Sequence, residues 1–130
     1  MASNIALVER LNKAAETKDF DTVKSLLHPD YTLKDPMMEF HSAKEALEFM
    51  KDCPFECKLE NVEFVAESGD KVVQTLDAVM VAPVSFRFRM CDILTIEDGK
   101  VCSEEVFYDT AQIPPEARQI GEKAMKAKAA

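Results

Sequence analysis

The segment SFRFRMCDILTIEDGKVCSEEVFYD (Ser85–Asp109) decides the fold class, because apolar residues recur there at every second position. This alternation is typical of a β-strand with one buried face, and it occurs on both sides of the pair Asp98-Gly99. Asp-Gly is a strong signal for a tight hairpin turn. The segment therefore predicts two antiparallel strands, Ser85–Glu97 and Val101–Asp109.

Upstream of this hairpin, the chain carries two further strand patterns and, before those, helical patterns. The alternation extends to Glu56–Glu67 and Lys71–Val81, whereas the apolar period before Glu56 is close to four. Helices are expected over Asn4–Thr17, from the Asp19 cap to His28-Pro29, and from the Ser42 cap to a point before Pro54, with a short strand at Tyr31–Lys34. Helices followed by a strand meander predict an α+β domain, with the helices packed on one face of a curved, mostly antiparallel sheet.

The length of 130 residues suits one domain, residues 1–130, and no linker or repeat divides it. The ordered core is expected to cover about residues 4–113. The tail, residues 114–130, is expected to hold a short terminal helix that frays over Lys123–Ala130.

Charge and composition exclude several classes of function. The 16 basic and 24 acidic residues give a net charge of −8, which disfavours nucleic acid and anionic membranes as partners. No apolar run approaches the ~18 residues of a membrane span, and no signal-peptide pattern is seen at the N-terminus. The four cysteines form no CxxC motif and lie at no zinc-finger spacing from either histidine. We therefore expect a cytoplasmic protein with reduced thiols, no metal site and no cofactor.

One face of the predicted strand Ser85–Glu97 is apolar except for the carboxylate Asp92. Alternation places this residue beside Phe86, Phe88 and Met90. Because a carboxylate in apolar surroundings is costly to ionise, its pKa should rise unless it is paired, and such groups are candidates for functional sites. The structural alternative is that Asp92 caps a backbone amide or pairs with a buried arginine.

Asp35 is the second candidate carboxylate. It follows a short strand and precedes Pro36, so it lies where the chain turns into a loop. Turn chemistry alone also explains an Asp-Pro pair. Arg87 and Arg89 are expected on the outer, solvated or subunit-facing side of the sheet.

Four motifs carry a resemblance to a known family: AAETKDFDTVKSLLHPDYTLKDP (Ala14–Pro36), SAKEALEFM (Ser42–Met50), CDILTIEDGKV (Cys91–Val101) and EVFYDTAQI (Glu105–Ile113). In this order the chain resembles the nuclear-transport-factor-2-like (NTF2-like) superfamily, within it the ketosteroid-isomerase and SnoaL-like branch, from Ala6 to about Ile113. The resemblance implies a cone of curved sheet closed by three N-terminal helices, a deep hydrophobic pocket and commonly a homodimer.

The resemblance also implies roles for individual residues. Asp35 stands where ketosteroid isomerases have their general base, and Asp92 where they keep a protonated aspartic acid that donates a hydrogen bond to the enolate oxygen. Leu11 stands where those enzymes have an oxyanion tyrosine. The residues expected to contact a substrate are Leu11, Tyr31, Phe86, Phe88 and Met90.

Two main hypotheses for function follow. The first is a cofactor-free isomerase that moves a proton next to a carbonyl of a hydrophobic small molecule, with Asp35 and Asp92 catalytic. The second is a non-catalytic ligand-binding or dimerisation domain of the same fold. Cyclase, dehydratase or hydrolase chemistry is a further alternative. A cyclase base would be Glu105 or Asp109, whereas the aspartate of limonene-epoxide hydrolases falls on Val106.

Overall fold

The computed structural model describes the backbone of residues 3–129 and the side chains of residues 3–124. Within this part of the chain, four α-helices accompany one sheet of six strands. In chain order the elements are α1 (Asn4–Glu16), α2 (Phe20–Leu26), β1 (Leu27–Lys34), β2 (Glu39–Phe40), α3 (Ala43–Asp52), β3 (Glu56–Ser68), β4 (Lys71–Ala82), β5 (Phe86–Glu97), β6 (Lys100–Phe107), the 3₁₀ turn η1 (Thr110–Gln112) and α4 (Pro115–Ala129).

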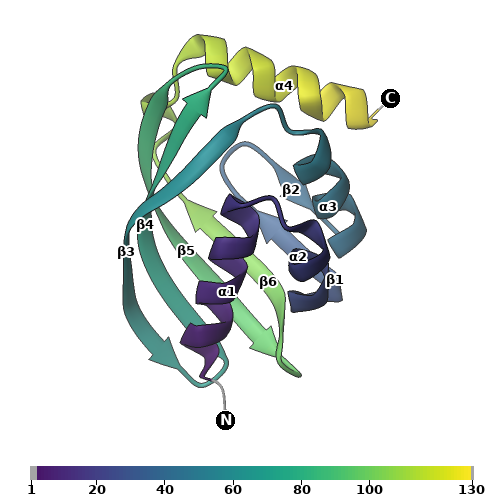
Figure 1. Cartoon of the computed structure of the whole chain (residues 1–130), viewed down its shortest axis with the longest axis vertical. Helices are drawn as coiled ribbons and strands as arrows, with labels where there is room; N and C mark the ends of the chain where they lie inside the picture. Colours follow the sequence, from purple (N-terminus) through teal and green to yellow (C-terminus); the bar gives the residue numbers. More distant parts are fainter. Residues whose placement is uncertain (1–2, 130) are drawn as a thin grey trace.

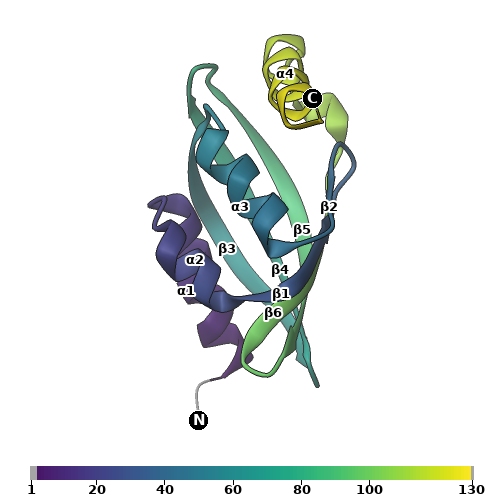
Figure 2. The same cartoon turned by 90° about the vertical axis from the view of Figure 1, so that its right-hand side faces the viewer.

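The sheet is open, curved and mixed, with strand order β2-β1-β6-β5-β4-β3. Every neighbouring pair is antiparallel except β1 and β6, which run parallel. Helices α1, α2 and α3 lie on one face of this sheet (Figures 1 and 2). The predicted α+β class, with three N-terminal helices on a mostly antiparallel sheet, is therefore confirmed.

Each of the three N-terminal helices begins at a capping residue, of which the sequence predicts Asp19 and Ser42 but not Ser3. The side chains of Ser3, Asp19 and Ser42 each accept a hydrogen bond from a backbone N–H in the first turn of the helix that follows. In α1 the residues Val8 and Leu11 are buried against the main core. Capping and one apolar face thus fix where each helix starts and which side meets the sheet.

The first strand differs from the prediction. It begins at Leu27, directly after α2, and not at Tyr31. Its parallel pairing with β6 is interrupted between Leu27 and Thr32, and this irregular stretch contains Pro29, which has no N–H to donate. The two-residue strand β2 was not predicted at all; it pairs with the end of β1.

The C-terminal segment is more extensive than the short helix that the sequence suggests. Helix α4 runs to Ala129 and lies across the end of the fold opposite the N-terminus (Figure 1). Ile113 and Ala117 are buried in a second core cluster with Phe88. The predicted fraying of Lys123–Ala130 is not seen over residues 123–129, whose backbone is helical, and Ala130 lies outside the described residues. No helix in the described part of the chain is long and apolar enough to cross a membrane.

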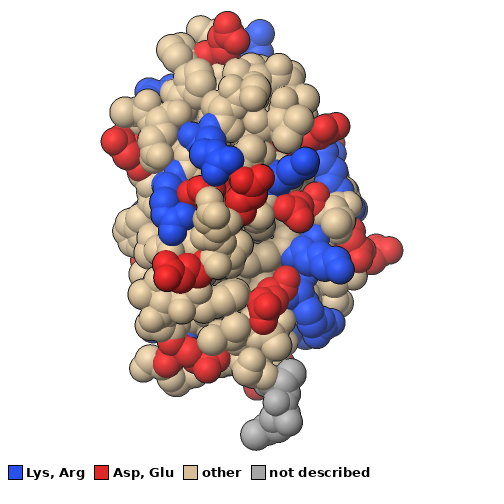
Figure 3. All heavy atoms as spheres, turned by 60° about the vertical axis from the view of Figure 1, so that its left-hand side comes forward, with Lys and Arg blue, Asp and Glu red and all other residues tan. Residues whose placement is uncertain are grey.

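The outer face of the sheet carries a charged cluster. Arg87 and Arg89, both on β5, each place a guanidinium nitrogen 2.9 Å from a carboxylate oxygen of Asp77 on β4, and Arg87 also binds Glu60. Figure 3 shows basic and acidic side chains side by side on this part of the surface. The two arginines are thus on the outer face, as the alternation predicts.

Candidate functional site

An apolar cavity lies between the sheet and the helices, and it consists of two chambers. The outer chamber has a volume of about 280 Å³, and the inner chamber about 340 Å³. Because five residues line both, the chambers adjoin; these are Ala15, Met38, Phe49, Met50 and Met80. Three of the five are methionines, whose flexible side chains suit a passage that adapts to its contents.

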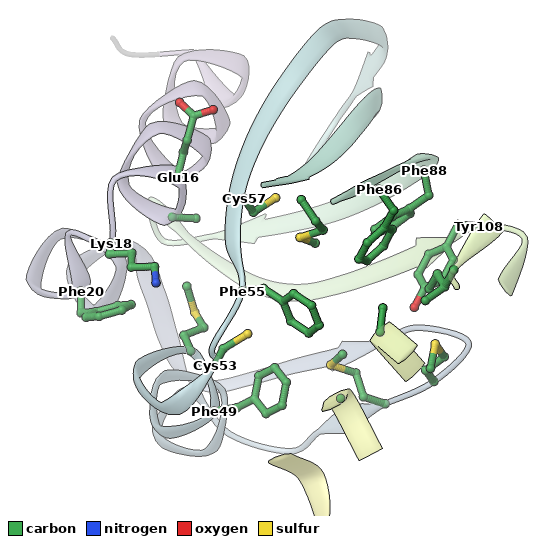
Figure 4. A pocket seen from close by; sticks show the side chains of 18 residues that line it. Glu16, Lys18, Phe20, Phe49, Cys53, Phe55, Cys57, Phe86, Phe88 and Tyr108 are labelled. Atoms are coloured by element: carbon green, nitrogen blue, oxygen red, sulfur yellow. The ribbon is translucent and has the colours of Figure 1, made fainter. Parts of the chain in front are cut away.

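The outer chamber is aromatic. Phe88 packs against Phe86 and Tyr108, with ring centroids 6.1 and 4.8 Å apart, and Phe55 meets Phe86 edge to face at 6.1 Å. Figure 4 shows Phe86, Phe88 and Tyr108 together on one side of this chamber, with Phe49 on another. Such a surface favours a flat apolar group.

Asp92 marks the polar end of the inner chamber. Its side chain is on the inner face of β5, and the residue is 3 % exposed. Oδ2 accepts a hydrogen bond of 3.0 Å from Gln74, directly opposite on β4, whereas Oδ1 meets no hydrogen-bond donor among the described residues. Burial raises the pKa of Asp92 well above its usual range, and the neighbouring Glu104 carboxyl raises it further.

A second carboxylate, Glu104, also lines the inner chamber. It is the Cα partner of Leu94 on β5, so it is on the same face as Asp92. The hydroxyl of Tyr31 donates a hydrogen bond of 2.7 Å to Glu104 Oε1. Burial, followed by the charge of Glu104, raises the pKa of Tyr31 well above its ordinary value, so this hydroxyl remains protonated as a donor.

Sequence analysis missed Glu104 because of a β-bulge in β6. Ile96 pairs with Val101, but Thr95 pairs with Ser103, so Cys102 is an extra residue in the ladder. The bulge shifts the alternation by one residue, and Glu104 rather than Glu105 then faces inward. In a regular strand without this bulge, alternation from Val101 would place Glu105 on the inner face instead.

The polar network continues from Asp92 to the first helix. Asn12 and Gln74 exchange two hydrogen bonds through their carboxamides, of 2.8 and 3.2 Å, and Asn12 also lines the inner chamber. Gln74 is fully buried, so these bonds satisfy polar atoms that would otherwise be costly to bury. The sequence signal that was overlooked is Gln74 at an inward position of an otherwise apolar strand.

Asp35 directly follows the last residue of β1, and it is not among the residues that line either chamber. Its Oδ1 accepts backbone hydrogen bonds from Met37 (2.7 Å) and Met38 (2.8 Å). Burial raises the pKa of Asp35, while these two hydrogen bonds and the nearby Tyr108 hydroxyl oppose the rise. Asp35 therefore lies close to Tyr108, which lines the outer chamber.

The remaining predicted residues divide between the chambers. Leu11, Tyr31 and Met90 line the inner chamber with Asp92, and Phe86 and Phe88 line the outer one. Leu11 belongs to the main core cluster and offers no hydroxyl.

The three late-strand positions considered for other chemistries differ in burial. Glu105 and Asp109 are exposed, and Asp109 caps the turn η1 by accepting the N–H of Ala111. Val106 is buried and pairs with Asp92. Neither acidic candidate thus faces the cavity, and Glu104 is the acidic residue of β6 that does.

Comparison with solved structures identifies the same fold in several proteins. A putative ketosteroid isomerase from Kribbella flavida matches with a TM-score of 0.71 and 19 % identity, over 85 % of this chain and 80 % of that one. A limonene-epoxide-hydrolase (LEH)-like epoxide hydrolase from M. tuberculosis has a TM-score of 0.71 and 17 % identity, over 95 % and 92 % of the two chains. A putative polyketide cyclase from Xanthomonas campestris has a TM-score of 0.72 and 13 % identity, over 89 % and 95 %. At these identities the likeness extends to the fold alone.

Sequence comparison defines the family. No curated protein sequence matches this chain. The family model described as the SnoaL-like domain matches residues 8–104, which is most of the sequence and includes Asp35, Asp92 and Glu104. The chain therefore belongs to the SnoaL-like domain family, and it has the fold of NTF2-like proteins.

Proposed function

We propose that this protein is a cofactor-free enzyme of the isomerase type, which moves a proton next to a carbonyl of a hydrophobic small molecule. The observation that supports it most is the buried Asp92 carboxyl at the end of an apolar cavity, with Oδ1 facing no donor. A carboxyl group whose pKa is raised in this way keeps its proton to higher pH than an exposed aspartate, and in the protonated form it donates a hydrogen bond. Proton transfer next to a carbonyl needs only such acid and base groups.

In this mechanism Asp92 donates its O–H to the carbonyl oxygen, and Asp35 is the base. As the carbon proton leaves, negative charge develops on the oxygen, and a preorganised donor in a water-poor cavity stabilises it. Asp35 lines neither chamber, so the substrate carbon has to reach it beside Tyr108; Asp35 then takes the proton from one carbon and returns it to another. Its raised pKa makes its carboxylate a better base than an exposed aspartate.

The test uses a β,γ-unsaturated ketosteroid, whose conversion to the conjugated isomer is followed by ultraviolet absorbance. We expect the wild type to convert it and Asp35→Asn to lower kcat far more than it weakens binding. Asp92→Asn should lower kcat by roughly 10²–10³-fold, as removal of one oxyanion donor does in other enzymes. Equal losses of turnover and binding in Asp35→Asn would argue against a base, and no conversion by the wild type would remove steroid isomerisation.

One observation favours a second candidate, a non-catalytic binding domain. Oδ1 of Asp35 already accepts two backbone N–H groups of its own turn, which is a complete structural role. In that case the cavity binds an apolar ligand without turnover, and Asp35→Asn changes neither binding nor any reaction.

The sequence also predicts a homodimer. Light scattering after size-exclusion chromatography tests this by measuring the molar mass of the protein in solution.

A further inference from the structure

We propose that Asp92 and Glu104 form a carboxyl pair that holds one proton between them, and that Glu104 is the positioning residue that keeps this proton on Asp92. The mechanistic consequence rests on the proposed function: in the free protein the Asp92 O–H donates to Glu104, and a bound carbonyl oxygen takes over this hydrogen bond from Glu104. The carboxyl pair itself is argued from the geometry of the inner chamber.

The first argument is register. Asp92 is paired with Val106, and Glu104 with Leu94, so the two acidic residues are diagonal neighbours on one face of the β5–β6 ladder. Diagonal side chains of this length come within reach of each other. Both side chains line the inner chamber, and the charge of Glu104 acts on the Asp92 carboxyl there.

The second argument is the orphaned oxygen of Asp92. A buried polar atom without a partner is costly, and Oδ1 has no N–H or hydroxyl donor among the described residues. Two carboxylates repel each other, but a carboxyl O–H and a carboxylate form a strong hydrogen bond. One proton between Asp92 and Glu104 therefore satisfies Oδ1 with no further group.

The third argument decides which residue holds the proton. Oε1 of Glu104 accepts the Tyr31 hydroxyl at 2.7 Å, which stabilises the ionised form of Glu104. Asp92 accepts only the Gln74 carboxamide and is the more buried of the two. The neutral form is thus favoured at Asp92 and the charged form at Glu104.

The other groups around the pair do not offer a competing cation. Asn12 on α1 reaches the site through Gln74 on β4, Tyr31 faces it from β1, and Cys91 precedes Asp92 on β5. Asp35 adds a further negative charge near Glu104. No lysine or arginine is found among the described residues that line the inner chamber. The pair must therefore be balanced by its own proton.

The test needs no substrate, because the carboxyl carbons of Asp and Glu are observed directly by ¹³C NMR during a pH titration. The Asp92 signal is assigned by its loss in Asp92→Asn. We expect Asp92 to be protonated at neutral pH in the wild type, and its apparent titration midpoint to fall by about one unit or more in Glu104→Gln. Glu105→Gln is the matched control, since it removes the same charge from the next, exposed residue, and it should leave the midpoint unchanged.

A second variant keeps the test decisive if Glu104→Gln does not fold. Tyr31→Phe removes the hydroxyl that stabilises ionised Glu104, so the proton should move toward Glu104 and the two carboxyl signals should shift in opposite directions at neutral pH. An ionised Asp92 in the wild type overturns the proposal, as does a midpoint that Glu104→Gln leaves in place. If these titrations behave as expected while no ketone is isomerised, only the proposed function fails.

Discussion

The Tyr31 hydroxyl donates a hydrogen bond of 2.7 Å to Glu104 across the parallel pair of β1 and β6, although 73 residues separate them in sequence. Tyr31 is buried, and Glu104 lines the inner chamber beside Asp92. A hydrogen bond to a charged group in such surroundings is among the stronger ones in a protein. This contact connects the first strand to the last, and it stabilises the negative charge of Glu104 next to Asp92.

Tyr31→Phe should therefore destabilise the protein by about 1.5–3 kcal/mol at neutral pH, the usual contribution of a hydrogen bond to a charged group. Urea unfolding measures the free energy of unfolding. In a Glu104→Gln background the same substitution should cost clearly less, because the charged acceptor is already gone. Equal losses in both backgrounds would show that the hydroxyl does not act through Glu104.

Asp92→Asn should make the protein more stable at neutral pH while impairing the proposed reaction. The pKa of Asp92 is raised in the folded state, so the unfolded chain binds fewer protons above about pH 4. The stability that this group contributes is present below about pH 4 and is lost as pH rises through the folded pKa. An amide does not ionise, so the gain in Tm should grow from acid to neutral pH. A gain that is constant with pH would contradict the prediction.

Glu104→Gln should move the alkaline limb of the pH–rate profile to lower pH, if the protein isomerises a ketone. Removing the Glu104 charge lowers the pKa of Asp92, so Asp92 loses its proton, and the reaction its donor, at a lower pH. At acid pH the variant should keep most of the wild-type kcat. Steady-state rates of the ketosteroid assay over pH measure this. A uniform loss at every pH would instead indicate general disruption of the site.

Ala15→Leu should weaken the binding of an apolar ligand that occupies both chambers. Ala15 lines the outer and the inner chamber, so added carbon atoms narrow the passage between them. Titration calorimetry with a saturated ketosteroid should show at least a roughly tenfold loss of affinity, or about 1.4 kcal/mol. Ala66→Leu on exposed β3 is the control and should bind as the wild type does. Unchanged affinity in Ala15→Leu would mean that the ligand uses one chamber only.

Asp77→Asn should destabilise the protein near neutral pH. Hydrogen bonds from Asn61, Arg89 and Arg87 lower the pKa of Asp77 to about 2. A lowered pKa contributes stability above the unfolded value of about 3.8, and this stability is lost as pH falls toward 2. The difference between wild type and variant, measured by urea unfolding, should therefore shrink between pH 4 and pH 2. A difference that persists unchanged at pH 2 would refute this role.

The local elements of this fold were predictable because their signals are local. Ser42 begins α3 through its own side chain, and Asp98 and Gly99 both adopt the left-handed conformation that the tight hairpin requires. The inward position of Asp92 follows from alternation along β5. In each case the physical cause acts within a few residues, so one sequence contains it.

Pairings between distant strands were not predictable. Strand β2 and the parallel β1–β6 ladder depend on partners far along the chain. The extent of α4 depends on Ile113 and Ala117 packing against Phe88, which no periodicity within the tail reveals.

The sequence by itself determined the fold class, the caps Asp19 and Ser42, the hairpin and the apolar face that carries Asp92. Only the tertiary structure decided that Glu104, rather than Glu105, lies beside Asp92, because the bulge at Cys102 shifts the alternation of β6 by one residue. It also decided that Asp35 lines neither chamber and lies close to Tyr108, which lines the outer one. The alternation of one strand fixes the face of a side chain, but its neighbours depend on register, which is set between strands.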